Sequence, residues 1–248
     1  MTRPLAELEN LLRVPEYPLS AKYDVQWIVQ NEMGAQSLWL VESLARRMAL
    51  RPGMRVLDMG CGKAMTSVFL AKEFGVQVWA VDLRVDPSDN WQRAREAGVE
   101  HLVYPVKAEA RSLPFAREFF DAVVSINAYQ YFGTDELYFA QHYAPLARPG
   151  AQLGFIMPGL TRDYGDAIPA HIEAYKIPDI LAWHTPEWWN RHFTKTGLVS
   201  VECAGTLDGH DGWRLWERWQ YAMDRVGLLK EDAGRYVTFI RLVLRKNG

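Results

Sequence analysis

Short apolar runs recur through the middle of the chain, each bounded by turn-forming residues. These runs predict strands at 54-MRVLDMG-60, 76-VQVWAVDL-83, 101-HLVYPV-106, 120-FDAVVSI-126 and 151-AQLGFIM-157. The stretches before and between them predict helical structure over 20–50, with the clearest spacing in 35–50, and helices over 64–74, 90–97 and 135–146. Because the strand runs are continuously apolar rather than alternating, we expect a mostly parallel sheet covered by helices on both faces.

The last third of the chain is aromatic-rich and has a different pattern. Two helices are predicted at 168–176 and 185–197, and a strand is predicted at 198–205. A further helix at 213–226 precedes a long strand at 236–246. We expect the last two strands to form an antiparallel hairpin at the sheet edge, split by this inserted helix.

Composition narrows the function classes. The 248 residues are 49% hydrophobic and carry a net charge of −2, so there is no basic excess of the kind that nucleic-acid binding favours. No apolar run is long enough to cross a bilayer, and the first residues lack the apolar core of a signal peptide. The 2 cysteines predict a reducing cytoplasm rather than a disulfide scaffold, and no cysteine–histidine spacing predicts a metal site.

A glycine turn follows the first predicted strand, in 56-VLDMGCGKAMTS-67. In open parallel sheets, ligands bind at the carboxyl ends of the strands, beside such a turn. Gly60 and Gly62 permit a tight turn and a close ligand, but Ala64 stands near where a dinucleotide fingerprint has a third glycine. Asp82 ends the next strand, where it could bind ribose hydroxyls or only form the turn. These features fit NAD, FAD and S-adenosylmethionine (SAM) equally.

The order of several motifs separates these cofactors. VLDMGCG and VDL are followed by 108-AEARSLPF-115, 119-FFDAVVSINAYQYFG-133 and 145-PLARPGAQLGF-155. From about Gly53 to Pro158 this order resembles the class I SAM-dependent methyltransferases, in their small-molecule branch. The resemblance implies an α/β, Rossmann-like methyltransferase sheet, mostly parallel with an antiparallel last strand. It also implies N-terminal helices and an aromatic-rich helical lid.

The chain is accordingly divided into three parts of one domain. Residues 1–50 form an N-terminal helical cap over the SAM site, and residues 51–158 form the SAM-binding Rossmann-like core. Residues 159–248 supply the lid helices, the inserted helix and the C-terminal strands. We expect a monomer or a homodimer.

The resemblance also implies roles for individual cofactor-binding residues. Gly60, Cys61 and Gly62 would lie against the methionine and ribose of SAM, and Asp58 would orient its amino acid end. Asp82, with Leu83 beside it, would bind the ribose diol. The remaining contacts fall on Glu109 and Ala110 at the adenine and on Asn127 and Ala128 beside the methyl donor. Glu109 is longer than the usual Asp and could equally be a solvated loop acid.

The acceptor side is less constrained by sequence. The segment NAYQYF lacks the short two-proline motif of exocyclic-amine methyltransferases, which favours a small-molecule substrate over a nucleic acid. Tyr129 and Tyr131 are placed closest to the acceptor. His171 and His184, in the lid, are the better candidates for a general base. The other histidines considered are His142, His192 and His210.

Aromatic residues cluster outside the predicted core. Tyr23 and Trp27 are one helical turn apart, and as a hypothesis they fold over the donor. Trp183, Trp188 and Trp189 lie in the lid, where they could wall a pocket and attract a cation by about 0.5–2 kcal/mol each. The tryptophans of the inserted helix, such as Trp216, fit an ordinary packing stripe better.

Four functions remain open. The first is methyl transfer from SAM to a small-molecule acceptor by in-line displacement. The second is another SAM-consuming reaction, cyclisation or a lyase step at the aminobutyryl arm. The third is SAM binding without turnover, and the fourth is a nicotinamide dehydrogenase, against which the shortened glycine fingerprint counts.

Overall fold

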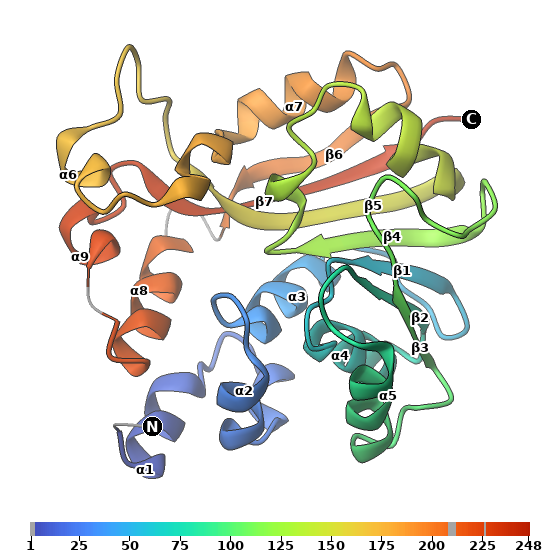
Figure 1. Cartoon of the computed structure of the whole chain (residues 1–248), viewed down its shortest axis with the longest axis horizontal. Helices are drawn as coiled ribbons and strands as arrows, with labels where there is room; N and C mark the ends of the chain where they lie inside the picture. The colour runs from blue at the N-terminus through green and yellow to red at the C-terminus, as the bar shows by residue number, and fades with distance from the viewer. Residues whose placement is uncertain (1–2, 208–211, 226) are drawn as a thin grey trace.

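A single mixed sheet forms the centre of the molecule (Figure 1). The computed structural model describes residues 3–207, 212–225 and 227–248. The strand order is β3-β2-β1-β4-β5-β7-β6. The strands are β1 (Arg55–Met59), β2 (Gln77–Asp82), β3 (Val103–Lys107), β4 (Phe120–Ile126), β5 (Ala147–Leu160), β6 (Val199–Thr206) and β7 (Val237–Lys246).

Strand pairing confirms the predicted fold class. β1 pairs in parallel with β2 and β4, and the pairs β2–β3 and β4–β5 are parallel as well. β7 is antiparallel to both β5 and β6, and it lies between them. Pro105 is tolerated inside β3 because β3 is an edge strand that pairs only with β2.

Helices cover both faces of the sheet (Figure 1). The helices are α1 (Leu5–Leu12), α2 (Val25–Asn31), α3 (Ser37–Ala45), α4 (Met65–Phe74), α5 (Pro87–Glu96), α6 (Ala170–Glu173), α7 (Pro186–Thr194), α8 (Gly212–Ala222) and α9 (Leu228–Asp232). One apolar core joins α1 to α5 and α8 to one face, and a second joins α7 and the segment after β4 to the other. Among the described residues, no helix is long and apolar enough to span a membrane.

The predicted helix over 135–146 is wrong in type. The structure has a π-helical turn at Phe139–Tyr143 and a 3₁₀ turn at Ala144–Leu146. Pro145 explains why no regular helix continues to 146, because proline lacks an N–H group and its ring clashes with the carbonyl one helical turn earlier. The helix over 168–176 is similarly reduced to α6, while α9 was not predicted at all.

Candidate active site

A cavity of about 870 Å³ opens at the carboxyl ends of β1, β2 and β4. Ligand pockets typically enclose roughly 300–1,000 Å³, so this one has room for a cofactor and a second small molecule. One half, which we call the donor half because the predicted cofactor-binding residues line it, is formed by the loop from α2 to α3 and the turn after β1, together with Asp82–Arg84, Ala108–Arg111 and Ile126–Ala128. Its other half is lined by Gln130, Tyr131, Phe132, Pro158, Ile177, Asp179, Trp183 and Trp216.

The glycine turn is held tightly beneath this cavity. The N–H groups of Gly60 and Cys61 donate to the carbonyl oxygen of Val81, at 2.8 and 3.0 Å. Gly60 has φ +75°, and a Cβ there would lie 2.4 Å from the Cβ of Ala128. Only glycine therefore fits at this position, because both the backbone conformation and the closeness of the chain after β4 exclude a side chain.

Ala64 adopts the conformation that a third glycine would have. Its φ and ψ are +59° and +21°, and it is the N-cap of α4. The left-handed region costs a non-glycine residue about 1–2 kcal/mol. Complete burial of the Ala64 side chain partly offsets this cost, so the departure from the glycine pattern leaves the turn intact.

Asp58 lies behind the cavity wall rather than in it. Its Oδ2 accepts hydrogen bonds from the hydroxyls of Thr66 and Ser67, both at 2.6 Å, and none of the described residues gives Oδ1 a partner. Complete burial raises the pKa of Asp58 to about 6, against the lowering effect of the two hydroxyls; the nearby charge of Asp82 also raises it. Asp58 thus anchors the first turn of α4, and its contact with a bound cofactor stays a prediction.

Asp82 does form a turn, as one of its two interpretations required. Its Oδ1 accepts from the N–H groups of Arg84 and Val85, at 2.8 and 3.1 Å, and its Oδ2 accepts from Gly62 N at 2.9 Å. An ionised carboxylate has about four acceptor sites, so Oδ2 can take a further donor. Asp82 and the exposed Leu83 both line the cavity, which leaves the ribose role open to test.

The other predicted cofactor residues also lie at the cavity. Cys61, Glu109, Ala110, Asn127 and Ala128 all line it. Burial raises the pKa of Cys61 well above its usual range, so its thiol stays neutral. The Glu109 carboxylate is exposed and accepts a hydrogen bond from Arg111 N at 2.7 Å.

The two predicted tyrosines lie on opposite sides of the cavity wall. Tyr131 lines the cavity, is 63% exposed, and donates its hydroxyl to Asp179 Oδ2 at 3.0 Å. Partial desolvation and the hydrogen bond to Asp179 raise the pKa of Tyr131, so its hydroxyl is a donor at neutral pH. Tyr129 instead is fully buried, with its ring centroid 4.5 Å from that of Phe155. Its predicted place beside the acceptor is therefore corrected to a core position.

None of the histidines that the structure describes lines the cavity. His171 Nε2 lies 2.9 Å from Asp232 Oδ1, where it joins α6 to α9. The His184 ring stacks on Trp188 with centroids 3.7 Å apart, and burial lowers the pKa of His184. Both were predicted as general bases, but packing in the lid directs them elsewhere. His210 lies outside the described residues.

The N-terminal helices reach the cavity through different residues from those predicted. Tyr23 and Trp27 pack with ring centroids 5.7 Å apart and line a separate hollow of about 290 Å³ with Lys72 and Glu73. The C-terminal end of α2, not its first turn, points toward the glycine turn, so Asn31–Ala35 and Ser37 line the main cavity instead. The helical pattern predicted over 20–50 is therefore interrupted between Asn31 and Ser37, where Gly34 disfavours a helix interior.

Comparison with known proteins supports the resemblance to methyltransferases that the sequence motifs indicate. A family described as a methyltransferase domain matches residues 56–150. The sterol 24-C-methyltransferase of Schizosaccharomyces pombe is 29% identical over 167 residues, which cover 65% of this chain and 43% of that protein. The glycine/sarcosine/dimethylglycine N-methyltransferase of Actinopolyspora halophila is 28% identical over 177 residues, which cover 70% of this chain and 30% of that protein.

The fold has solved counterparts. Geranyl diphosphate C-methyltransferase from Streptomyces coelicolor, in complex with S-adenosyl-L-homocysteine, superposes with a TM-score of 0.71 at 14% identity, over 96% of this chain and 85% of that one. The chain spans less than half the length of the first curated relatives that it matches. The domain match, the relatives and the shared sheet agree with the ordered motifs around the glycine turn. Residues 56–150 thus form a methyltransferase domain, and the chain has the fold of the class I SAM-dependent methyltransferases, whose cofactor is S-adenosylmethionine.

Proposed function

We propose that this protein transfers the methyl group of SAM to a small, largely apolar acceptor. The observation that carries the proposal is the two-sided cavity, with the glycine turn on one side and Tyr131, Trp183 and Trp216 on the other. SAM, when bound, supplies an electrophilic methyl group on a sulfonium. The cavity is large enough for an acceptor to lie beside it.

The donor half of the cavity fits SAM. Gly60 and Gly62 expose backbone rather than side chains at the floor, and Asp82 keeps acceptor capacity at the cavity edge for a pair of ribose hydroxyls. Glu109 and Ala110 follow β3, at the position where the family reads the adenine. We therefore assign these residues to donor binding, as the sequence predicted.

The acceptor half favours positioning over proton transfer. Ile177, Trp183 and Pro158 present apolar surface, and the rings of Trp183 and Trp216 meet edge to face at 5.5 Å. Holding two reactants in line in a dry site can contribute on the order of 7–11 kcal/mol. Aromatic faces also attract the positive charge that the donor brings, so the same walls orient the reacting pair.

Tyr131 and Asp179 are the polar groups assigned to the acceptor. The Asp179 carboxylate can take a proton from an acceptor that must lose one, while the Tyr131 hydroxyl holds that carboxylate in place. The relatives differ in their named acceptors, a sterol in one and glycine derivatives in another. The apolar lining favours an acceptor with an apolar body, which carries at most one amine or hydroxyl.

A direct test uses two variants with opposite expected effects. Asp82→Ala should weaken SAM binding, measured by calorimetry, because it removes both the hydroxyl acceptor and the bond to Gly62. Tyr131→Phe should leave SAM binding unchanged and lower kcat/KM by about tenfold, the effect of one hydrogen bond of roughly 1.4 kcal/mol. Unchanged SAM affinity in Asp82→Ala would refute the donor assignment.

We also propose a reducing, cytoplasmic location. Both Cys61 and Cys203 are free thiols, which supports it. Fractionation of cells that express the tagged protein would check this, and recovery from an oxidising compartment would contradict it.

A further inference from the structure

We propose that Glu32 is a positioning residue for the methyl donor. Its carboxylate holds the loop between α2 and α3, residues 32–36, in the shape that walls the donor half of the cavity. We call this segment the donor loop. The inference rests on the proposed function, since it assigns a role to one wall of the same site.

The Glu32 carboxylate organises the donor loop through four hydrogen bonds. Oε1 accepts from Met33 N at 3.2 Å, from Gly34 N at 2.9 Å and from the Ser37 hydroxyl at 2.7 Å. Oε2 accepts at 2.6 Å from the N–H group of Ser37, the first residue of α3. One side chain thus satisfies three backbone N–H groups in and directly after a loop that has no regular structure to pair them.

The donor loop touches the two segments that are assigned to the donor. Met33 covers the glycine turn, and a Cβ on Gly62 would lie 3.1 Å from its sulfur. Gly34 lies against the end of β4, where a Cβ would be 3.0 Å from the side-chain nitrogen of Asn127. A change in loop shape would therefore move a wall of the donor site at both places.

The loop is fixed on its N-terminal side by two cationic side chains from the core. Lys63, in the glycine turn, donates to the carbonyl oxygen of Gln30 at 2.8 Å. Arg93, on α5, donates to Asn31 Oδ1 at 2.9 Å. The end of α2 is thus tied to the glycine turn, which borders the cavity, and to α5.

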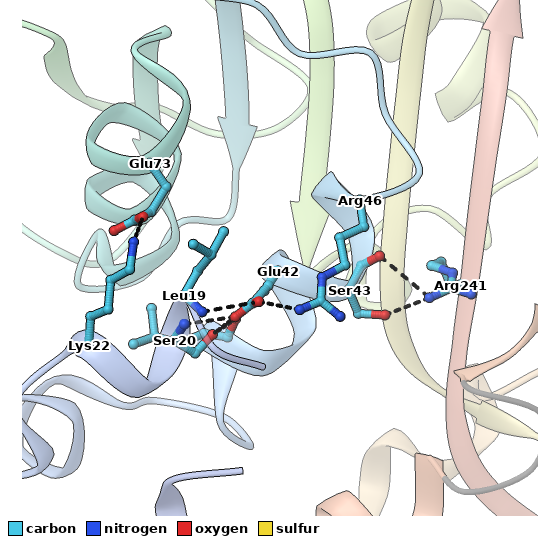
Figure 2. A network of polar contacts seen from close by, with 9 residues as sticks. Leu19, Ser20, Lys22, Glu42, Ser43, Arg46, Glu73 and Arg241 are labelled. Atoms are coloured by element: carbon cyan, nitrogen blue, oxygen red, sulfur yellow. Dashed lines mark hydrogen bonds and ion pairs between the residues drawn. The ribbon is translucent and has the colours of Figure 1, made fainter. Parts of the chain in front are cut away.

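On its C-terminal side the loop runs into α3, which is anchored in two directions (Figure 2). The buried Glu42 carboxylate accepts from the N–H and the hydroxyl of Ser20, both at 2.7 Å, and from Leu19 N at 3.2 Å. On the next position of α3, Ser43 accepts hydrogen bonds from Arg241 of β7. With both flanking helices held, the donor loop is a preformed wall whose shape depends on its internal contacts.

Those internal contacts work against local strain. Gln36 in the loop and Asn127 facing it both have left-handed backbones, with φ of +43° and +57°. Their side-chain amides are buried, and no described residue gives either amide a hydrogen bond. Each of these features is unfavourable, so the contacts of Glu32 are needed to hold the loop in this conformation.

The test compares SAM affinity in two matched variants of the intact chain. Glu32→Gln keeps Oε1 but sets an amide N–H against Ser37 N, donor facing donor. We expect calorimetry to show that the variant binds SAM about tenfold more weakly than the intact protein, or more weakly still. The KM for SAM should rise, and kcat should change much less. Glu73→Gln is the control, because this carboxylate accepts from Lys22 in the same region at 2.6 Å but lies outside the main cavity. Its SAM affinity should equal that of the intact protein.

The outcomes separate the inference from the proposed function. Equal SAM binding by folded Glu32→Gln and the intact protein overturns the role of Glu32. An equal loss in both variants also overturns it, since it indicates general loosening of the N-terminal helices. Should Glu32→Gln fail to fold, Ser37→Ala removes only one of the four bonds, and a fall of several-fold in SAM affinity is expected; no fall overturns the role. An intact protein that binds no SAM refutes the proposed function, and the inference with it.

Discussion

The buried carboxylate of Asp58 should make the protein less stable as the pH rises from about 4 to 7. Its pKa is about 6 in the folded chain, compared with 3.8 when exposed. Well below pH 4 the carboxyl is protonated in both the folded and the unfolded state, so it adds no pH dependence to the free energy of unfolding. As the pH rises past 4 the unfolded state ionises first, so the folded state binds more protons and its free energy of unfolding falls. The loss levels off once the folded group also ionises, above pH 6.

The size of this effect follows from the two pKa values. Each unit of difference corresponds to about 1.4 kcal/mol, so the interval from 3.8 to about 6 gives a loss of about 3 kcal/mol. Burial without a partner for Oδ1 is its main cause. The two hydroxyls of Thr66 and Ser67 reduce the penalty but do not remove it.

The assay is urea unfolding of the intact protein and of Asp58→Asn at a series of pH values. Asn cannot ionise, so the difference in unfolding free energy between the two proteins should shift by about 3 kcal/mol against the intact protein between pH 4 and 7. Asp86→Asn provides a control, because the bonds to Ser88 lower the pKa of the exposed Asp86 carboxyl. Its stabilisation is lost only as the pH falls below about 4, so Asp86→Asn should show almost no shift between pH 4 and 7 and a shift of opposite sign below that range. A constant difference between the intact protein and Asp58→Asn would refute the reasoning.

Three substitutions test the turn and the lid. Gly60→Ala should abolish SAM binding and destabilise by about 1–3 kcal/mol in urea unfolding, because its Cβ would lie 2.4 Å from that of Ala128; a stable, SAM-binding variant would contradict this. Ala64→Gly should change the free energy of unfolding by less than about 1 kcal/mol. The relief of about 1–2 kcal/mol of backbone strain is offset by the loss of a buried methyl group and by the greater entropy of the unfolded chain. A larger loss of stability would show that Ala64 is not strained. Thr185→Ala should cost about 1 kcal/mol in thermal unfolding, because Thr185 Oγ1 caps α7 by accepting from Trp188 N at 3.2 Å, and an unchanged transition would count against that cap.

Much of the fold could be predicted from the sequence because its strands are short, apolar and bounded by turn residues. The run at 120-FDAVVSI-126 matches β4, and the parallel order places the ends of β1, β2 and β4 at one edge. The glycine turn and Asp82 could be brought together from sequence for this reason. The predicted start of the helix over 185–197 is also correct, because Thr185 caps α7 and Pro186 is its first residue, and capping signals are local. Its predicted end is three residues too late, since α7 ends at Thr194.

The rest depends on contacts that local pattern does not encode. Tyr129 and Tyr131 are two residues apart, yet the 3₁₀ turn that contains them directs one ring into the core and the other into the cavity. The contact between Met33 and Gly62 joins segments distant in sequence, so no periodicity could indicate it. His171 and His184 have side chains suited to catalysis, but their packing against Asp232 and Trp188 is decided by tertiary structure.

The central claim is methyl transfer, and the fate of a labelled methyl group tests it most directly. The intact protein would be incubated with SAM carrying an isotopically labelled methyl, together with apolar small molecules that bear amine, hydroxyl or alkene groups, and followed by mass spectrometry. Asp82→Ala would run beside it. The account predicts that the label appears on an acceptor with the intact protein and is much reduced with the variant. Consumption of SAM with the label retained on a sulfur fragment, or binding of SAM without any product, would contradict it.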